Sequence, residues 1–161
     1  MEHHSAGEIS HSGGVHYGKF ALMIGVSFIA MYFLMFAMIN SSANFFNNVN
    51  QLYMAGLMAA VMIPIELGVM FGMYPNRRVN VILIVAGFVL LAIFWTFTRR
   101  QVAVGDKQFL RSMIPHHAGA ILMCDQAPIS DAEIRRLCVE ITSSQQREVD
   151  QMKGILKRLG S

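Results

Sequence analysis

The segment FALMIGVSFIAMYFLMFAMI, residues 20–39, is 20 residues long and carries no charge. A helix of about 20 apolar residues is long enough to cross the hydrocarbon core of a bilayer, which is ~30 Å thick. Two further runs have the same character: Leu52–Tyr74 has one charged residue in 23, and Val79–Thr98 has none in 20. We therefore expect an all-α protein with three transmembrane helices, because a helix satisfies its own backbone hydrogen bonds in lipid.

The distribution of charge separates a membrane region from a water-facing region. Of the 161 residues, 54% are hydrophobic and 14% are charged, whereas soluble domains have roughly 25% charged residues. Residues 1–100 contain eight charged residues, and residues 101–161 contain fifteen. This composition excludes a disordered chain, and a net charge of +3 with no basic run longer than two residues argues against nucleic-acid binding. We expect the lipid bilayer to be the partner of residues 19–100.

Residues 1–18 are rich in glycine, serine and histidine, and no apolar periodicity runs through them. We expect a mobile tail. Four of the six histidines of the chain lie here, and His3 and His4 are adjacent. Clustered histidines can bind metal, so this pair is a hypothesis for a secondary metal site. The alternative is adventitious binding, or no role at all.

Residues 101–161 are expected to form a helical hairpin, with helices over 106–126 and 130–159. Apolar residues repeat at helical spacing through both segments. Residues 127–129 make the turn, so the two helices run antiparallel. Since two helices form only a small core, we expect the hairpin to pack on a second copy of the chain or on the membrane helices.

The segment FLRSMIPHHAGAILMCDQA, residues 109–127, concentrates side chains that bind soft metals. Residues three or four apart are neighbours on a helix, so Met113 lies beside His116 and His117. A thioether together with imidazoles suits Cu(I), and imidazole also suits zinc and other divalent ions. The alternative is a buried histidine pair with methionine as an apolar filler.

Met123 and Cys124 are a second group of soft ligands in the same segment. They come seven residues after His116 and His117, respectively. Seven residues rise about 10 Å along a helix, which is too far for these side chains to share one ion comfortably. Met123 and Cys124 would therefore form a second locus, or accept ligands from another helix.

Two motifs in this region occur together and in order: MIPHH at residues 113–117 and QxxEVxxM at residues 145–152. Over about residues 104–158 the chain resembles the bacterial domain-of-unknown-function family 305. The resemblance implies a ferritin-like helical domain and a copper-binding protein of the periplasm or cell exterior, associated with copper resistance. The metal ligands that it implies are Met113, His116, His117, Met123 and Met152. Membrane-anchored members with three N-terminal spans are also similar around residues 16–23 and 73–78.

The position of the turn bears on how these residues meet. If the turn centres near Pro128, Met152 lies roughly 13 Å along the helix from the level of Met113. A second chain would then have to bring Met152 to the site, which favours a homodimer. Cys124 and Cys138 would likewise lie at different levels along the two helices. Bridged cysteines need Cα atoms within about 7 Å of each other. We therefore expect free thiols, or an intermolecular contact, instead of an intrachain disulfide.

Glu66 lies in the second hydrophobic run, where a carboxyl group is costly. Methionines flank it at spacings of four residues, and small residues follow the opposite face of the same helix. We expect Glu66 to face other helices and to bond to a group such as the hydroxyl of Ser27, or to its mate in a dimer. In one hypothesis Glu66 joins Met62 and Met70 in an ion or proton relay; in the other it only fixes helix association.

Three functions are compatible with these residues and with the resemblance. The first, which we favour, is a membrane-anchored copper-binding protein that buffers or delivers the ion on the periplasmic face. The second is a membrane transport component that uses the methionine-rich spans and Glu66. The third is a metal-dependent redox enzyme, which the lack of a Glu-x-x-His motif in residues 101–161 disfavours.

The orientation in the membrane is not decided by charge. Three spans place the two ends of the chain on opposite sides, and basic residues are nearly balanced between those sides. The resemblance alone therefore implies a bacterial inner membrane, with the N-terminus cytoplasmic and residues 101–161 periplasmic.

Overall fold

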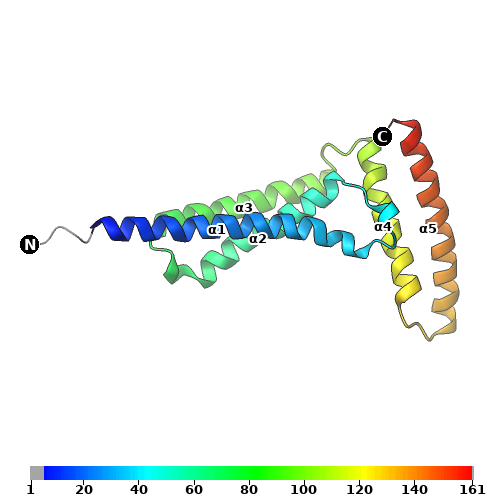
Figure 1. The fold of residues 1–161 in the computed structure, drawn as a ribbon, viewed down its shortest axis with the longest axis horizontal. Coiled ribbons are helices and arrows are strands. Elements are labelled where there is room, and N and C mark those ends of the chain that lie inside the picture. Colours follow the sequence, from blue (N-terminus) through cyan, green and yellow to red (C-terminus); the bar gives the residue numbers. More distant parts are fainter. Residues whose placement is uncertain (1–5, 161) are drawn as a thin grey trace, which may run out of the picture. The chain divides into compact units, whose positions relative to one another are not determined.

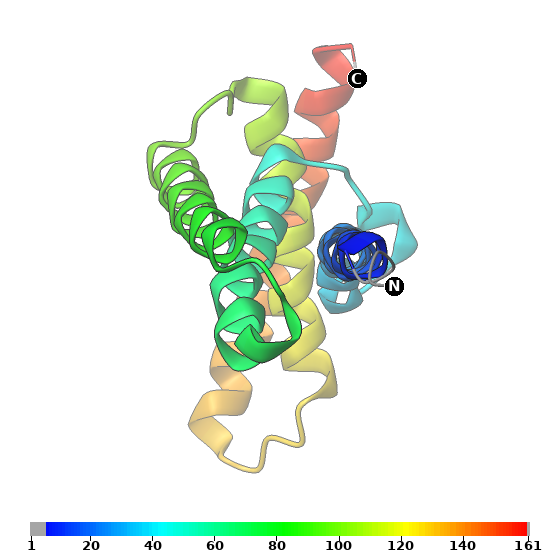
Figure 2. The same ribbon diagram turned by 90° about the vertical axis from the view of Figure 1, so that its left-hand side faces the viewer.

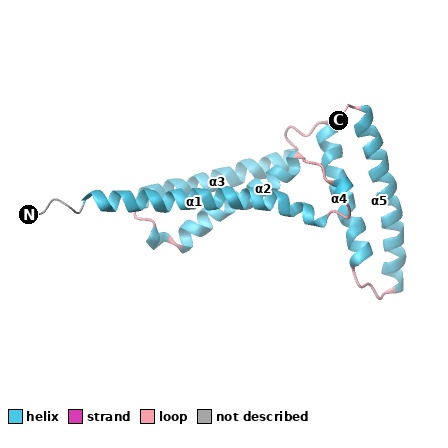
Figure 3. Cartoon of the chain, in the orientation of Figure 1, coloured by secondary structure: helices cyan, strands magenta, loops and turns pink. Residues whose placement is uncertain are grey.

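A computed structural model describes residues 6–160 of the chain, with side chains from residue 16 onward. These residues form helices and no strand, which confirms the all-α prediction (Figures 1 and 3). The α-helices are α1 (Ala6–Leu34), α2 (Val49–Val69), α3 (Arg77–Arg100), α4 (Asp106–Gln126) and α5 (Ala132–Arg158). Short 3₁₀ helices lie in the connections: η1 (Met35–Met38), η2 (Ser42–Asn44) and η3 (Phe71–Met73).

Three helical segments are long and apolar enough to cross a membrane, as predicted. They are His16–Met38, Val49–Val69 and Arg77–Arg100. Helix α1 begins at Ala6, ahead of the apolar run, in a segment for which the sequence predicted a mobile tail. Extending an existing helix costs much less than starting one, because each added residue gains a backbone hydrogen bond. His3 and His4 lie outside the described residues.

The chain divides into two compact units. One unit contains the residues up to Tyr32 together with Tyr53–Arg100, and the other contains Phe33–Leu52 together with the residues from Gln101 onward. One division between the units falls between Arg100 and Gln101. The connection between the first two spans, however, belongs with the C-terminal hairpin, whereas the sequence predicted it as part of the membrane region.

Polar groups of this first connection bind the beginning of α4. The backbone N–H of Val49 donates to Oε1 of Gln108 at 3.1 Å, and Nδ2 of Asn50 donates to Oγ of Ser112 at 3.2 Å. Phe46 packs against the hydrophobic cluster of the hairpin. The hairpin thus covers part of its surface with a segment of its own chain.

The unit that contains Tyr53–Arg100 is called the membrane unit below. In it, α1, α2 and α3 run alongside one another, and α1 is seen nearly end-on in Figure 2. Phe20 of α1, Leu67 of α2 and Tyr74 form a buried cluster against which side chains of α3 pack. Small residues in the first half of α2 allow α3 to approach α2 closely. A Cβ atom added at Gly56 would lie 2.6 Å from ring carbons of Phe94 on α3.

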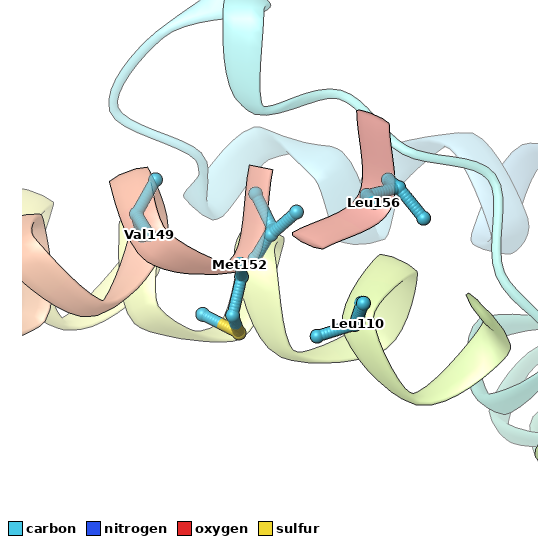
Figure 4. Close-up of a cluster of buried hydrophobic side chains, with 5 residues drawn as sticks. Leu110, Val149, Met152 and Leu156 are labelled. Carbon is cyan, nitrogen blue, oxygen red and sulfur yellow. The ribbon is translucent and has the colours of Figure 1, made fainter. Parts of the chain in front are cut away.

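Helices α4 and α5 form the antiparallel hairpin that the sequence predicts. Its core is a cluster of buried apolar side chains: Leu110, Ile114, Val149, Met152 and Leu156. Figure 4 shows that Leu110 comes from α4, and that the other three labelled side chains come from α5. The connection is residues 127–131, and the carboxylate of Asp131 caps α5 by accepting from the backbone N–H groups of Glu133 and Ile134.

The register of the hairpin differs from the predicted one, and two predictions are wrong for that reason. Cys124 and Cys138 form an intrachain disulfide, with Cα atoms 5.3 Å apart. Met152 belongs to the same buried cluster against which Met113 packs, so no second chain is needed to bring it there. The connection is extended at both of its ends, at Ala127 and at Asp131. The two helices therefore face each other about a midpoint near residue 131, later than the predicted turn.

Candidate metal centre

His117 lies at the interface between α4 and α5 and is 7% exposed. Its Nδ1 is 2.8 Å from the carbonyl oxygen of Met113, one turn earlier on α4. A carbonyl oxygen can only accept, so Nδ1 carries a proton and donates it. The other ring nitrogen, Nε2, lies 2.7 Å from Oε2 of Glu148 on α5. Both nitrogens are therefore engaged, and Nε2 is the one whose lone pair a metal ion would use.

Met113, His117, Glu148 and Met152 form a group that we call the interhelical cluster. Met113 and His117 are four residues apart on α4, and Glu148 and Met152 are four residues apart on α5. His117 contacts Glu148, and Met113 packs against the buried side chains that include Met152. The two pairs thus face each other in one register of the antiparallel hairpin. Helical bundles commonly build metal sites from side chains on facing helices.

The structure separates His116 and Met123 from this cluster. His116 is exposed, and its ring centroid lies 6.0 Å from that of His117, with an angle of 66° between the ring planes. Successive residues of a helix point about 100° apart, so adjacent histidines cannot both face α5. Met123 is 55% exposed. Of the five predicted ligands, Met113, His117 and Met152 lie together, whereas His116 and Met123 do not.

The disulfide occupies the second predicted locus. Cys124 is bonded to Cys138, and the thiolate, not the disulfide, is the form that binds metal. Among the residues that the structure describes, no group of three or more His, Cys, Asp and Glu side chains could hold a metal ion.

The donors of the interhelical cluster suit a soft ion. Two thioethers and an unprotonated imidazole nitrogen favour Cu(I), while a carboxylate is the ligand of harder divalent ions. Metal-bound histidines commonly donate their other ring N–H to a backbone carbonyl, which fixes the tautomer. His117 already makes that bond to Met113.

Glu148 is the member of the cluster that the sequence analysis missed. It lies four residues before Met152, as Met113 lies four residues before His117. Its side chain is 50% exposed, and only the register of the hairpin brings it to His117. The signal that could have found it is the shared spacing of four residues on two antiparallel helices.

Glu66 lies on α2 and is half-buried. Among the described residues, the predicted hydrogen bond to Ser27 is not formed, and no ion pair involves Glu66. The relay hypothesis and the helix-association hypothesis both stay predictions.

Two comparisons place the chain among known sequences. Residues 100–161 match the model of a domain of unknown function, DUF305. An uncharacterized protein of Acanthamoeba polyphaga mimivirus is 32% identical over 138 residues, which cover 84% of this chain and 89% of that protein. No solved structure matches the chain.

Proposed function

Since the chain belongs to the DUF305 family, we propose that it is a membrane-anchored metal-binding protein whose hairpin binds copper, Cu(I) in preference to zinc or nickel. Its task is to buffer or deliver the ion. The metal is the cargo of the protein, and the three apolar helices of the other unit are the anchor.

One observation carries this proposal: His117 contacts Glu148 across the hairpin, and Met113, four residues before His117, packs against the buried cluster that contains Met152. Met113 and Met152 would supply thioether sulfur, and His117 would supply Nε2. The buried cluster around the two methionines excludes water from one side of the site, which strengthens binding to polarizable sulfur ligands. His116 and Met123 are exposed and are assigned no part in holding the ion.

The disulfide supports placing the hairpin on the periplasmic side of the membrane. Disulfides form and persist in oxidising compartments and are rare in reducing ones. The bond between Cys124 and Cys138 therefore suits the periplasm, with the N-terminus in the cytoplasm. The first connection would lie on the same side as the hairpin, because Phe33–Leu52 packs with it in one unit.

A homodimer is part of the proposal, on a different ground from the predicted one. The first half of α5 exposes large apolar side chains: Ile134, Leu137 and Val139 are 49%, 53% and 70% exposed. A second hairpin could cover these side chains, as in a four-helix bundle. The metal site itself does not require the second copy.

Competition titration of the full chain in detergent tests the metal preference. We expect Cu(I) to displace both zinc and nickel, because the thioethers favour the softer ion. Binding should weaken below about pH 6, since a ligating imidazole nitrogen must be unprotonated. Equal or tighter binding of zinc would refute the preference for copper.

A further inference from the structure

Glu148 has a defined place in the interhelical cluster but no part in the function proposed above. We propose that Glu148 sets the metal preference of this site: its carboxylate weakens the binding of Cu(I) at His117 and strengthens the binding of a divalent ion such as zinc. The inference rests on the proposed function, because it concerns the same site.

The first step of the argument is the tautomer of His117. The carbonyl oxygen of Met113 holds a proton on Nδ1, so a metal ion must bind Nε2. Nε2 lies 2.7 Å from Oε2 of Glu148, so the atom that a metal ion would bind is already in contact with this carboxylate. The lone pair that would bind a metal is therefore engaged by Glu148.

The second step is what each ion gains when this contact opens. An ion bound tetrahedrally to both atoms at about 2.0–2.2 Å would hold them roughly 3.4 Å apart, which is less than about 1 Å farther than they are now. Zinc can therefore bind between the two atoms and keep the carboxylate as a ligand. Cu(I) gains little from a carboxylate, so it must displace Glu148 without compensation.

The third step is that Glu148 is able to move. Its side chain is 50% exposed, whereas that of His117 is 9% exposed and fixed by Met113. Opening the contact thus moves the carboxylate toward solvent and leaves the imidazole in place. Because the carboxylate of Glu148 competes with Cu(I) for His117, the site releases the ion more readily than it would without Glu148. Ready release suits buffering or delivery.

The test compares the full chain with Glu148→Ala and with a matched control, Glu140→Ala. Glu140 is an exposed carboxylate on the same helix. Dissociation constants for Cu(I) and for zinc are measured by competition with chromophoric chelators on metal-free protein in detergent. We expect Glu148→Ala to bind Cu(I) about tenfold more tightly, because the ion no longer has to break the hydrogen bond between His117 and Glu148. A factor of about ten corresponds to the free energy of one hydrogen bond to a charged group. It should bind zinc at least about tenfold more weakly. Glu140→Ala should change neither constant by more than about twofold.

A second measurement requires no metal. Nitrogen NMR of His117 in the metal-free protein should show a proton on Nδ1, and the Nε2 signal should move in Glu148→Ala. Glu148→Gln keeps the size of the side chain and its hydrogen bonding, so it should retain the fold, weaken zinc binding and leave Cu(I) binding at least as tight as in the unaltered chain.

The outcomes separate this inference from the proposed function. Unchanged affinities in Glu148→Ala, or weaker binding of both ions, would overturn the role of Glu148 in metal preference. Failure of the proposed function looks different: the unaltered chain and His117→Ala would then bind Cu(I) equally.

Discussion

His116 and His117 are neighbours in the sequence but occupy different environments. His117 is buried and bonded through both ring nitrogens, while His116 is exposed. The helix itself causes this difference, because consecutive side chains point about 100° apart. A motif with two adjacent histidines therefore supplies one side chain that faces the hairpin interface and one that faces outward.

Met152 and Met123 test the difference between a buried and an exposed side chain through its effect on stability. Met152 is 9% exposed within the hairpin core, and Met123 is 55% exposed. Met152→Ala should lower the free energy of unfolding by about 2–5 kcal/mol, because it leaves a cavity in the core. Met123→Ala should change it by less than about 0.5 kcal/mol. The measurement is thermal denaturation followed by circular dichroism. Equal losses of stability in the two variants would contradict the difference in burial between Met152 and Met123.

At the scale of the elements, the disulfide sets how α4 and α5 are aligned. Cys124 and Cys138 close a loop with a sequence separation of 14. Replacing both with serine should cost about 3 kcal/mol of stability, since a loop of this size restricts the unfolded chain by about that amount. The unaltered protein should contain no free thiol when it is denatured and treated with a thiol reagent. Two reactive thiols per chain, before any reduction, would contradict the intrachain bond.

The packing of α2 on α3 can be tested at glycines of one helix. A Cβ at Gly56 would meet the ring of Phe94 at 2.6 Å, whereas nothing lies within 4 Å of one at Gly68. Gly56→Ala should therefore destabilise the membrane unit by about 1–3 kcal/mol, because the aromatic ring must move. Gly68→Ala is the matched control and should be neutral. Equal unfolding temperatures in detergent for the two variants would show that the contact is not formed.

Most helices could be predicted from the sequence. The spans are long and apolar, and the first hairpin helix was predicted over the residues that α4 occupies, 106–126. Their length and periodicity are local properties of the chain, which is why they are readable. The start of α1 could not be predicted from the sequence. The helix extends through glycine, serine and histidine residues, which show no apolar periodicity.

The candidate site could be predicted only in part. Met113, His117 and Met152 were named, but the register that joins them depends on the conformation of residues 127–131, for which the sequence carries no simple rule. Glu148 was missed for the same reason. The packing of Phe46 on the hairpin was also missed, since a polar connection has no periodic pattern that marks its one buried contact.

At the scale of the whole molecule, the three candidate spans would place the two ends of the chain on opposite sides of a membrane. We predict that a periplasm-dependent reporter fused after Ser161 is active, because the disulfide requires an oxidising compartment. A reporter inserted in the first connection, between Asn40 and Gln51, should behave in the same way, since that segment packs with the hairpin. Activity of both reporters only in the cytoplasm would reverse the orientation.

The central claim is that the hairpin binds Cu(I) through the inward histidine of the pair. The most direct test is Cu(I) affinity, measured by competition with a chromophoric chelator on the full chain in detergent, for the unaltered protein, His117→Ala and His116→Ala. We predict that His117→Ala weakens binding by about 100-fold or more, as expected for loss of a ligand, while His116→Ala stays within about twofold. Equal binding by all three proteins, or a larger loss in His116→Ala, would contradict the account.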